Sequence, residues 1–230
     1  MKIASYSDPH GCLDVKIPNS VDLLLVGGDI SDCRGSHNPV NQLYWIKNHF
    51  IPYIKDQAKD IVFIPGNHDF CFEMLMNQYR EDEFRNDLPK NVHYLRDSMI
   101  EIDGLKIYGT PWTPPFYDWA FMAEETELDR KFSGIPEGID ILLSHGPAYG
   151  LADAITERFD IGKNCGSHSL LKHVQRVMPT YFFSGHIHSA DHRVNEYVYN
   201  NKVTKYANVS ILDEYYEPAY FPLVYPPPQI

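Results

Sequence analysis

Five short hydrophobic runs in this 230-residue chain are each followed at once by side chains that bind divalent metal ions. Each run is bounded by Gly or Pro and is rich in Ile, Leu, Val or aromatic residues, which is typical of a buried strand. The pairs of run and following motif are 2–7 before Asp8-Pro9-His10, 21–26 before Gly27-Gly28-Asp29, 61–64 before Pro65-Gly66-Asn67-His68-Asp69, 139–143 before Ser144-His145-Gly146-Pro147, and 181–183 before Ser184-Gly185-His186-Ile187-His188. Asp, Asn and His supply the oxygen and imidazole donors that such cations prefer, and strand ends at one edge of an α/β sheet are where these sheets place ligand sites. The pattern therefore predicts an α/β fold with a two-metal centre.

Each motif also has a purely structural interpretation. Asp8-Pro9-His10 alone is a plausible turn, and Gly28-Asp29 after a strand is a common one. The Gly-Asn-His-Asp run is more specific, because three donors or proton carriers follow one tight turn. His186 and His188 point to the same side if the local backbone is extended, since side chains alternate along a strand. It is the joint occurrence of all five motifs, each after a strand, that favours the metal centre.

In this order, the motifs resemble those of the calcineurin-like metallophosphoesterase superfamily: Asp-x-His, Gly-Asp, Gly-Asn-His-Asp/Glu, a lone His and Gly-His-x-His. All five are intact, and the resemblance covers nearly the whole chain. Residues 105–112, 138–147 and 208–210 are similar to the metallophosphoesterase-domain-containing, cyclic-nucleotide phosphodiesterase-like branch. The resemblance implies a single domain over residues 1–230, folded as a two-sheet sandwich of mixed β-sheets flanked by helices.

The same resemblance implies a ligand set for two divalent metal ions. One ion would be held by Asp8, His10 and His188, the other by Asn67, His145 and His186, with Asp29 bridging the two. Such bridging holds two cations about 3.5 to 4 Å apart, where a hydroxide shared between them can attack phosphorus in line. These nitrogen and oxygen donors suit Mn, Fe, Zn, Co or Ni, and manganese is the first expectation.

His68 lies between two donors without being assigned as a ligand, and its ordinary pKa near 6.5 lets it give a proton at neutral pH. We interpret it as the general acid for the leaving group. In the related phosphatases its partner is an Asp that corresponds here to Asp32, and Asp69 is the rival partner. An Arg that holds phosphate often follows that Asp, but this chain has Cys33 there and Arg34 one place later. Arg34 is therefore only a candidate substrate contact.

Charge and composition indicate a small substrate. The formal net charge is −11, and no basic run is longer than an isolated Lys-Arg pair. Proteins that grip long nucleic acid neutralise several phosphates with Lys and Arg, so a small phosphodiester or nucleotide is expected rather than a long polyanion. No apolar run approaches the roughly 20 residues of a membrane span, and a strand beginning at Lys2 leaves no room for a signal peptide. We expect a cytoplasmic protein with free thiols and no membrane partner.

Helices are expected at 39–49, capped by Asn38 and interrupted near Pro52, at 73–83, and after Ser167 as far as Pro179. Further strands are expected at 92–95, 99–102 and 105–108, with a hairpin turn at Asp103-Gly104. The Pro- and Tyr-rich tail, residues 213–230, is expected to wrap the domain in extended form.

The segment 110–121 combines three prolines with five aromatic residues. It suits a rigid loop packed on its own domain, a wall of the substrate pocket or a subunit contact.

Two classes of function follow. The first is a hydrolase of small phosphodiesters, with cyclic nucleotides as candidates and phosphomonoesters as a side activity. The second is a non-catalytic scaffold of the same fold; scaffolds usually lose ligands or the acid, whereas here the seven predicted ligands and His68 are all present. A nuclease is a third alternative, which the net charge disfavours.

Overall fold

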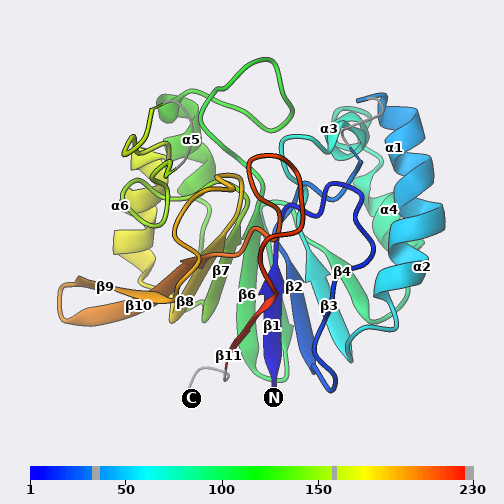
Figure 1. Ribbon diagram of the computed structural model, residues 1–230, viewed down its shortest axis with the longest axis horizontal. Coiled ribbons are helices and arrows are strands. Elements are labelled where there is room, and N and C mark those ends of the chain that lie inside the picture. Colours follow the sequence, from blue (N-terminus) through cyan, green and yellow to red (C-terminus); the bar gives the residue numbers. More distant parts are fainter. Residues whose placement is uncertain (33–36, 157–159, 226–230) are drawn as a thin grey trace.

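Two β-sheets pack face to face in the centre of the molecule, and helices cover the outer face of each sheet (Figure 1). The computed structural model describes residues 1–32, 37–156 and 160–225. This arrangement confirms the predicted α/β fold of two mixed sheets flanked by helices.

Both sheets are parallel at their centres and antiparallel at an edge. The first sheet has the order β11 (Leu223–Tyr225), β1 (Ile3–Tyr6), β2 (Leu23–Val26), β3 (Asp60–Phe63) and β4 (Val92–Tyr94). The second has the order β5 (Ser98–Ile102), β6 (Leu105–Thr110), β7 (Ile141–Ser144), β8 (Tyr181–Ser184), β10 (Lys202–Asn208) and β9 (Asn195–Tyr199). Strands β1 to β4 run parallel, as do β6, β7, β8 and β10, while β11, β5 and β9 are antiparallel to their neighbours. The strands that precede the five motifs therefore end at one edge of the sandwich.

The strands are apolar on both faces because each face is covered. Leu25 and Val62 of the first sheet belong to the core between the sheets, with Leu143 and Phe183 of the second. Their neighbours along the strands, such as Val26, turn the other way into the core beneath the helices. The near-continuous hydrophobic runs in the sequence thus reflect burial from two sides.

Helices α1 (Pro39–Trp45), α2 (Ile51–Ile54), α3 (Phe70–Asn77) and α4 (Glu81–Asn86) lie on one side of the sandwich, and α5 (Glu125–Phe132) and α6 (His168–Val177) on the other (Figure 1). The predicted N-caps are confirmed: the Asn38 side chain accepts from the backbone N–H groups of Val40 and Asn41, and Ser167 accepts from Leu170.

Two of the predicted helix boundaries are wrong. A π-helical turn, η1 (Ile46–Phe50), joins α1 to α2, so the chain stays helical past Pro52. Pro52 falls in the first turn of α2, where its missing N–H costs least. The helix predicted over 73–83 is in fact two helices. Tyr79 takes a left-handed conformation, with φ at 57°, and Arg80 N–H donates to the Leu75 carbonyl. This left-handed residue ends α3, in the position that Gly usually occupies.

The tail from Asp213 turns back over the strand ends and then enters the first sheet. A turn ends at Tyr216, whose φ is 62°, and β11 pairs with β1. Cys12, Cys71 and Cys165 are free thiols, as expected. Among the described residues, no helix is long and apolar enough to cross a membrane.

Candidate metal centre

The predicted ligands converge where the two sheets meet. Ser7 N–H donates to Val209 and Ile211 N–H donates to Ser7, so the chain just beyond β1 pairs with the chain just beyond β10. Four of the motif residues have φ angles in the left-handed region: Asp8, His10, Asp29 and His186. That conformation is uncommon for residues other than Gly and collects at functional sites, where the surrounding structure enforces it.

The first cluster consists of Asp8, His10 and His188, whose ligand atoms all lie within 4.8 Å of one another. Nε2 of His10 is 3.3 Å from Nε2 of His188, and the latter is 3.7 Å from the Asp8 carboxylate. All three side chains are buried. Two imidazole nitrogens and a carboxylate facing one small volume form a donor set that suits a divalent cation.

The second cluster consists of Asp29, His145 and His186, again within 4.8 Å. Oδ1 of Asn67 lies 2.7 Å from Nε2 of His145, which brings the predicted amide ligand to the same cluster. Nδ1 of His145 meets the Gly27 carbonyl at 2.9 Å, a contact that fixes the ring orientation and leaves Nε2 facing the cluster.

Asp29 joins the two clusters. Its Oδ2 atom is 3.7 Å from Nε2 of His10 and 3.5 Å from Nε2 of His145. One carboxylate oxygen thus lies between a ring of the first cluster and a ring of the second, where a carboxylate could bridge two ions.

Two motif glycines are required by the close approach of these carboxylates. A Cβ atom at Gly66 would collide with Oδ1 of Asp29, and one at Gly185 with Oδ2 of Asp8. The same close approach lets backbone N–H groups hydrogen-bond to the carboxylates. His186 N–H donates to Asp8, and His68 N–H donates to Oδ1 of Asp29. Gly66 and Gly185 are therefore needed for the ligand carboxylates to take these positions.

Charge pairing explains how two carboxylates are tolerated in a buried place. Burial raises the pKa of Asp8, but the nearby His188 ring, 3.7 Å away, outweighs burial and leaves that pKa below its usual value. The pKa of Asp29 is lowered in the same way by the charge of His145. Burial opposes protonation of His188 and His145, yet Asp8 and Asp29 raise the pKa of each ring to about 9. Burial lowers the pKa of His10 and of His186 to about 3, so these rings are neutral and have a lone pair to offer.

The pairing of each buried carboxylate with an imidazole ring suits these residues to holding metal ions. Nε2 of His188 lies 3.7 Å from the Asp8 carboxylate and Nε2 of His145 lies 3.5 Å from the Asp29 carboxylate, and a metal ion would take the place of the ring proton because a ligating imidazole must be neutral. Two buried donor clusters joined by a shared carboxylate match the requirements of two divalent ions. The chain's own residues therefore fit the implied cofactor.

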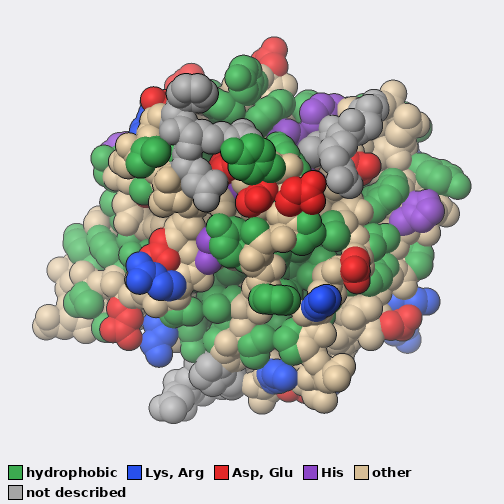
Figure 2. All heavy atoms as spheres, in the orientation of Figure 1, with side chains coloured by type: hydrophobic (Ala, Val, Ile, Leu, Met, Phe, Trp, Pro, Cys, Tyr) green, Lys and Arg blue, Asp and Glu red, His purple; other side chains and the backbone are tan. Residues whose placement is uncertain are grey.

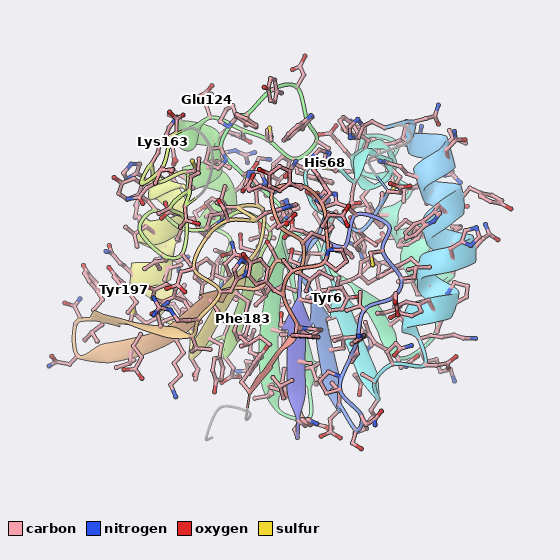
Figure 3. The ribbon with its side chains drawn as sticks, viewed as in Figure 1. Tyr6, His68, Glu124, Lys163, Phe183 and Tyr197 are labelled. Carbon is pink, nitrogen blue, oxygen red and sulfur yellow. The ribbon has the colours of Figure 1, made fainter. Side chains whose placement is uncertain are left out.

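His68 lies beside both clusters, above the strand ends (Figure 3). Its ring is 5.2 Å from the His10 ring and 4.3 Å from the Trp119 ring, measured between centroids. Nδ1 of His68 meets Nε2 of His37 at 2.9 Å. Burial lowers its pKa, with the Asp29 charge opposing that shift. The ring is thus held next to the metal centre without belonging to either cluster.

Asp69 hydrogen-bonds to backbone groups through its side chain. Its carboxylate accepts hydrogen bonds from the backbone N–H groups of Ile30, Ser31 and Gly66, so both oxygens are engaged in tying two motif loops together. Orientation of His68 by Asp32 or by Asp69 stays a prediction, and Asp32 is half-buried. Arg34 lies outside the described residues.

Several contributors to the site were not singled out from the sequence. Ser210 donates a 2.5 Å hydrogen bond to Oδ2 of Asp8, and Nδ1 of His188 meets the Asp213 carbonyl at 2.9 Å. The Tyr216 ring packs edge-on against the rings of His10 and His188. Residues 208–210 stood out only by their similarity to the branch, and no local pattern marked Tyr216 or His37.

The aromatic segment 110–121 is partly a packed loop and partly a border of the site. Trp112 and Phe121 are buried against each other, while Phe116 and Tyr117 are exposed and Trp119 packs against His68. The packed-loop interpretation thus describes Trp112 and Phe121, while the pocket-wall and subunit-contact interpretations of the exposed part stay predictions.

Comparison with known proteins places this geometry in a family. The family model for calcineurin-like phosphoesterase matches residues 1–190. The human metallophosphoesterase domain-containing protein 1 is 32% identical over 238 residues, covering 95% of this chain and 68% of that protein. The Caenorhabditis elegans UPF0046 protein C25E10.12 is 31% identical over 239 residues, covering 98% of this chain and 80% of that protein.

Solved structures share the fold at low sequence identity. TT1561 of Thermus thermophilus superposes with a TM-score of 0.60 at 10% identity, covering 97% of both chains. Phosphopantetheinyl hydrolase from Mycobacterium tuberculosis superposes with a TM-score of 0.54 at 13% identity, covering 94% of this chain and 90% of that one. The family match, the two relatives and the pair of donor clusters lead to one conclusion: the chain belongs to the calcineurin-like phosphoesterase family and is a metal-dependent phosphoesterase.

Proposed function

We propose that the protein hydrolyses small phosphodiesters, with cyclic nucleotides as candidate substrates, at a centre of two divalent metal ions. The observation that carries the two-metal part of this proposal is the position of Asp29, whose Oδ2 faces His10 on one side and His145 on the other. The substrate part rests on the resemblance to the cyclic-nucleotide branch and on the net charge of −11, which disfavours long polyanions.

The metal ions would neutralise charge on the phosphoryl group and activate water for in-line attack. The Asp8, His10 and His188 cluster would hold one ion, and Asn67, His145 and His186 the other, with Asp29 shared. The mixture of imidazole nitrogen and carboxylate or amide oxygen suits Mn, which we propose as the native metal ahead of Fe, Zn, Co and Ni.

The protein's own groups position the proton donor. The His68 ring gives a proton to the oxygen that leaves phosphorus, and its contacts with His37 and Trp119 hold it on the leaving-group side. The ligand rings are held from behind, because His188 contacts the Asp213 carbonyl and His145 contacts the Gly27 carbonyl. Tyr216 covers the edges of His10 and His188 and limits access of bulk water from that side.

A substrate screen of the metal-loaded protein tests the proposal. Hydrolysis of bis-p-nitrophenyl phosphate, or of a 2′,3′- or 3′,5′-cyclic nucleotide, should exceed hydrolysis of p-nitrophenyl phosphate. Asp29→Asn should abolish turnover of every substrate, whereas the matched change Asp82→Asn, at a side chain that is 91% exposed, should leave it unchanged. Robust monoesterase activity without diester turnover would overturn the diester assignment. Turnover of long duplex DNA would favour the nuclease, and metal-replete protein without any turnover would favour the scaffold.

A further inference from the structure

The 110–121 segment rises above the strand ends (Figure 1). Three of its aromatic side chains are in mutual contact. Phe116 and Tyr117 are in edge-to-face contact at 4.5 Å, and each lies 5.4 Å from the Trp119 ring. Phe116 is 54% exposed and Tyr117 is 76% exposed. We refer to Phe116, Tyr117 and Trp119 as the aromatic platform. Figure 2 shows hydrophobic side chains exposed along this upper edge of the molecule.

The base of the platform is fixed to the metal centre. Ala120 N–H donates to the backbone carbonyl of Asn67 at 3.0 Å, and Phe121 N–H donates to Glu73 at 3.0 Å. The two ends of the loop are closed by a 3.0 Å bond from Thr113 N–H to the Phe121 carbonyl. Because Asn67 is a predicted ligand, these bonds fix the position of the platform relative to the metal centre. A fixed platform reduces the entropy cost of binding a substrate there.

One member of the platform touches the predicted acid. The Trp119 ring packs against the His68 ring at 4.3 Å, while Phe116 and Tyr117 lie beyond it. A substrate group that contacts the platform would therefore lie on the leaving-group side of phosphorus, where His68 supplies the proton.

The chemistry of the segment identifies the kind of group that it fits. From Thr110 to Phe121 there is no Lys or Arg, and the single charged residue is Asp118. Such a segment repels a second phosphate and offers flat apolar rings. Stacking of a base on aromatic rings suits this surface, because every nucleobase has a π-face and needs no counter-charge.

We propose that the aromatic platform stacks the base of a nucleotide substrate and so makes nucleotide diesters the preferred class. This inference rests on the proposed function and deepens it, because it assigns three residues to substrate recognition. Recognition through stacking tolerates different bases, so the preference is for the presence of a base rather than for its identity.

Paired substrates that differ only in the base test this inference. The metal-loaded protein is assayed on adenosine 2′,3′-cyclic phosphate and on the base-free ribose 2′,3′-cyclic phosphate. Tyr117→Ala and Phe116→Ala should each lower the ratio of kcat/KM for the nucleotide over the base-free compound, by about 5- to 100-fold for the pair combined. Tyr79→Ala removes a tyrosine that is 95% exposed elsewhere on the surface and should leave the ratio unchanged.

Trp119 needs a separate variant because it also contacts His68. Trp119→Phe keeps a flat ring and should retain most of the base preference, whereas Trp119→Ala should lose it. Should Trp119 act only by positioning His68, Trp119→Ala would instead reduce turnover of both compounds equally. An unchanged ratio in all three alanine variants would overturn the inference.

Direct binding separates this inference from the proposed function. If the wild-type protein hydrolyses neither cyclic compound, the proposed activity fails, but calorimetric titration with adenosine 5′-monophosphate and with ribose 5-phosphate still tests the platform. Tighter binding of the nucleotide, lost in Phe116→Ala and Tyr117→Ala, would support base stacking. Equal binding of the two compounds would overturn it, whatever the catalytic result.

Discussion

The backbone N–H of His68 donates a 2.7 Å hydrogen bond to Oδ1 of Asp29, so the predicted acid and the predicted bridging carboxylate are joined through the main chain. The imidazole takes no part in this bond. Its ring instead faces His37 and Trp119. The side chain of His68 is therefore separable from the metal centre, and this separation allows a clean test of its role.

His68→Ala should leave the metal content unchanged and slow a nucleotide diester by about 10²- to 10⁴-fold, the usual worth of general acid catalysis. The loss on bis-p-nitrophenyl phosphate should be much smaller, because nitrophenolate leaves without needing a proton. Steady-state kinetics on both substrates, with elemental analysis of the same samples, measures this. Equal losses on both substrates with the metals intact would mean that His68 positions the phosphate, and the acid assignment would be dropped.

The residue that orients His68 can be identified by a loss of activity on the nucleotide diester that is larger than the loss on bis-p-nitrophenyl phosphate. Asp32→Asn should give a milder form of it if Asp32 orients the imidazole. Asp69→Asn should instead lower the free energy of unfolding by about 1 to 3 kcal/mol, because an amide replaces a buried carboxylate that accepts three backbone N–H groups. Chemical denaturation of the two variants distinguishes these outcomes.

Removal of the shared carboxylate should affect both metal sites. Asp29→Ala is expected to lower the metal content from two ions per chain toward none, whereas Asp8→Ala should mainly empty the first site. Elemental analysis combined with anomalous scattering measures occupancy at each position. A single occupied position in metal-replete wild-type protein would contradict the bridging arrangement.

Gly185→Ala should weaken the first metal site without any change to a ligand. The new Cβ atom would meet Oδ2 of Asp8 and the Ser7 hydroxyl at distances that real Cβ atoms do not show, so the carboxylate must move. We expect metal affinity at the first site to fall by about 10-fold or more, the usual cost of disturbing the groups that orient a ligand, measured by titration of the apoprotein. Gly134→Ala is the control, because its nearest neighbour is the Lys131 carbonyl at 3.3 Å, far along the chain from any predicted ligand.

An ion pair remote from the centre should give the protein an acid-sensitive stability. Glu81 accepts from Arg96 Nε at 2.7 Å and Nη2 at 2.5 Å, and from the Tyr94 hydroxyl at 2.9 Å. Burial raises the pKa of Glu81, but Arg96 outweighs burial and the pKa falls below the ordinary 4.5. A lowered carboxylate pKa adds stability above about pH 4.5 that is lost as the pH falls through the lower folded-state value.

Glu81→Gln should therefore cost about 1.5 to 3 kcal/mol at pH 7, the range for hydrogen bonds to a charged group. The difference from the wild type should shrink below about pH 4.5. Urea unfolding of the metal-free protein at about pH 7 and about pH 3.5, on either side of that value, measures both differences. Glu83→Gln breaks an exposed pair with Arg80 and should leave the stability nearly unchanged at either pH. A constant difference for Glu81→Gln across this range would show that packing, not charge, is what the change removes.

The strand ends were predictable because each is marked by a local signal. An apolar run bounded by Gly or Pro and followed by a donor identifies β1, β2, β3, β7 and β8 within a residue or two. Within each sheet, the convergence of the donors follows from the parallel direction of its strands. The contact of Asp29, which follows β2, with His145, which follows β7 of the other sheet, depends in addition on how the two sheets pack.

The remaining features depend on contacts between distant segments. The break between α3 and α4 has no glycine signal, because Tyr79 itself adopts the left-handed conformation. The hairpin of β9 and β10 turns at Asn200 and Asn201, both with positive φ, yet its flanking strands are largely exposed and lack a strong apolar pattern. Tyr216 reaches His10 only because the tail folds back, which a local pattern does not encode.

The hydrogen bond from Ser210 to Asp8 spans 202 positions of the chain, and β11, which pairs with β1, comes later still. During synthesis the Asp8 and His10 motif leaves the ribosome well before His188 and the residues that brace it. Contacts of such long sequence separation close late and slow the folding of a domain. A nascent chain halted before His188 has two donors of the first cluster but not the third. The third donor of that site is therefore supplied only after β8 (Tyr181–Ser184) has been made, so the full donor set of the first cluster depends on strands of both sheets.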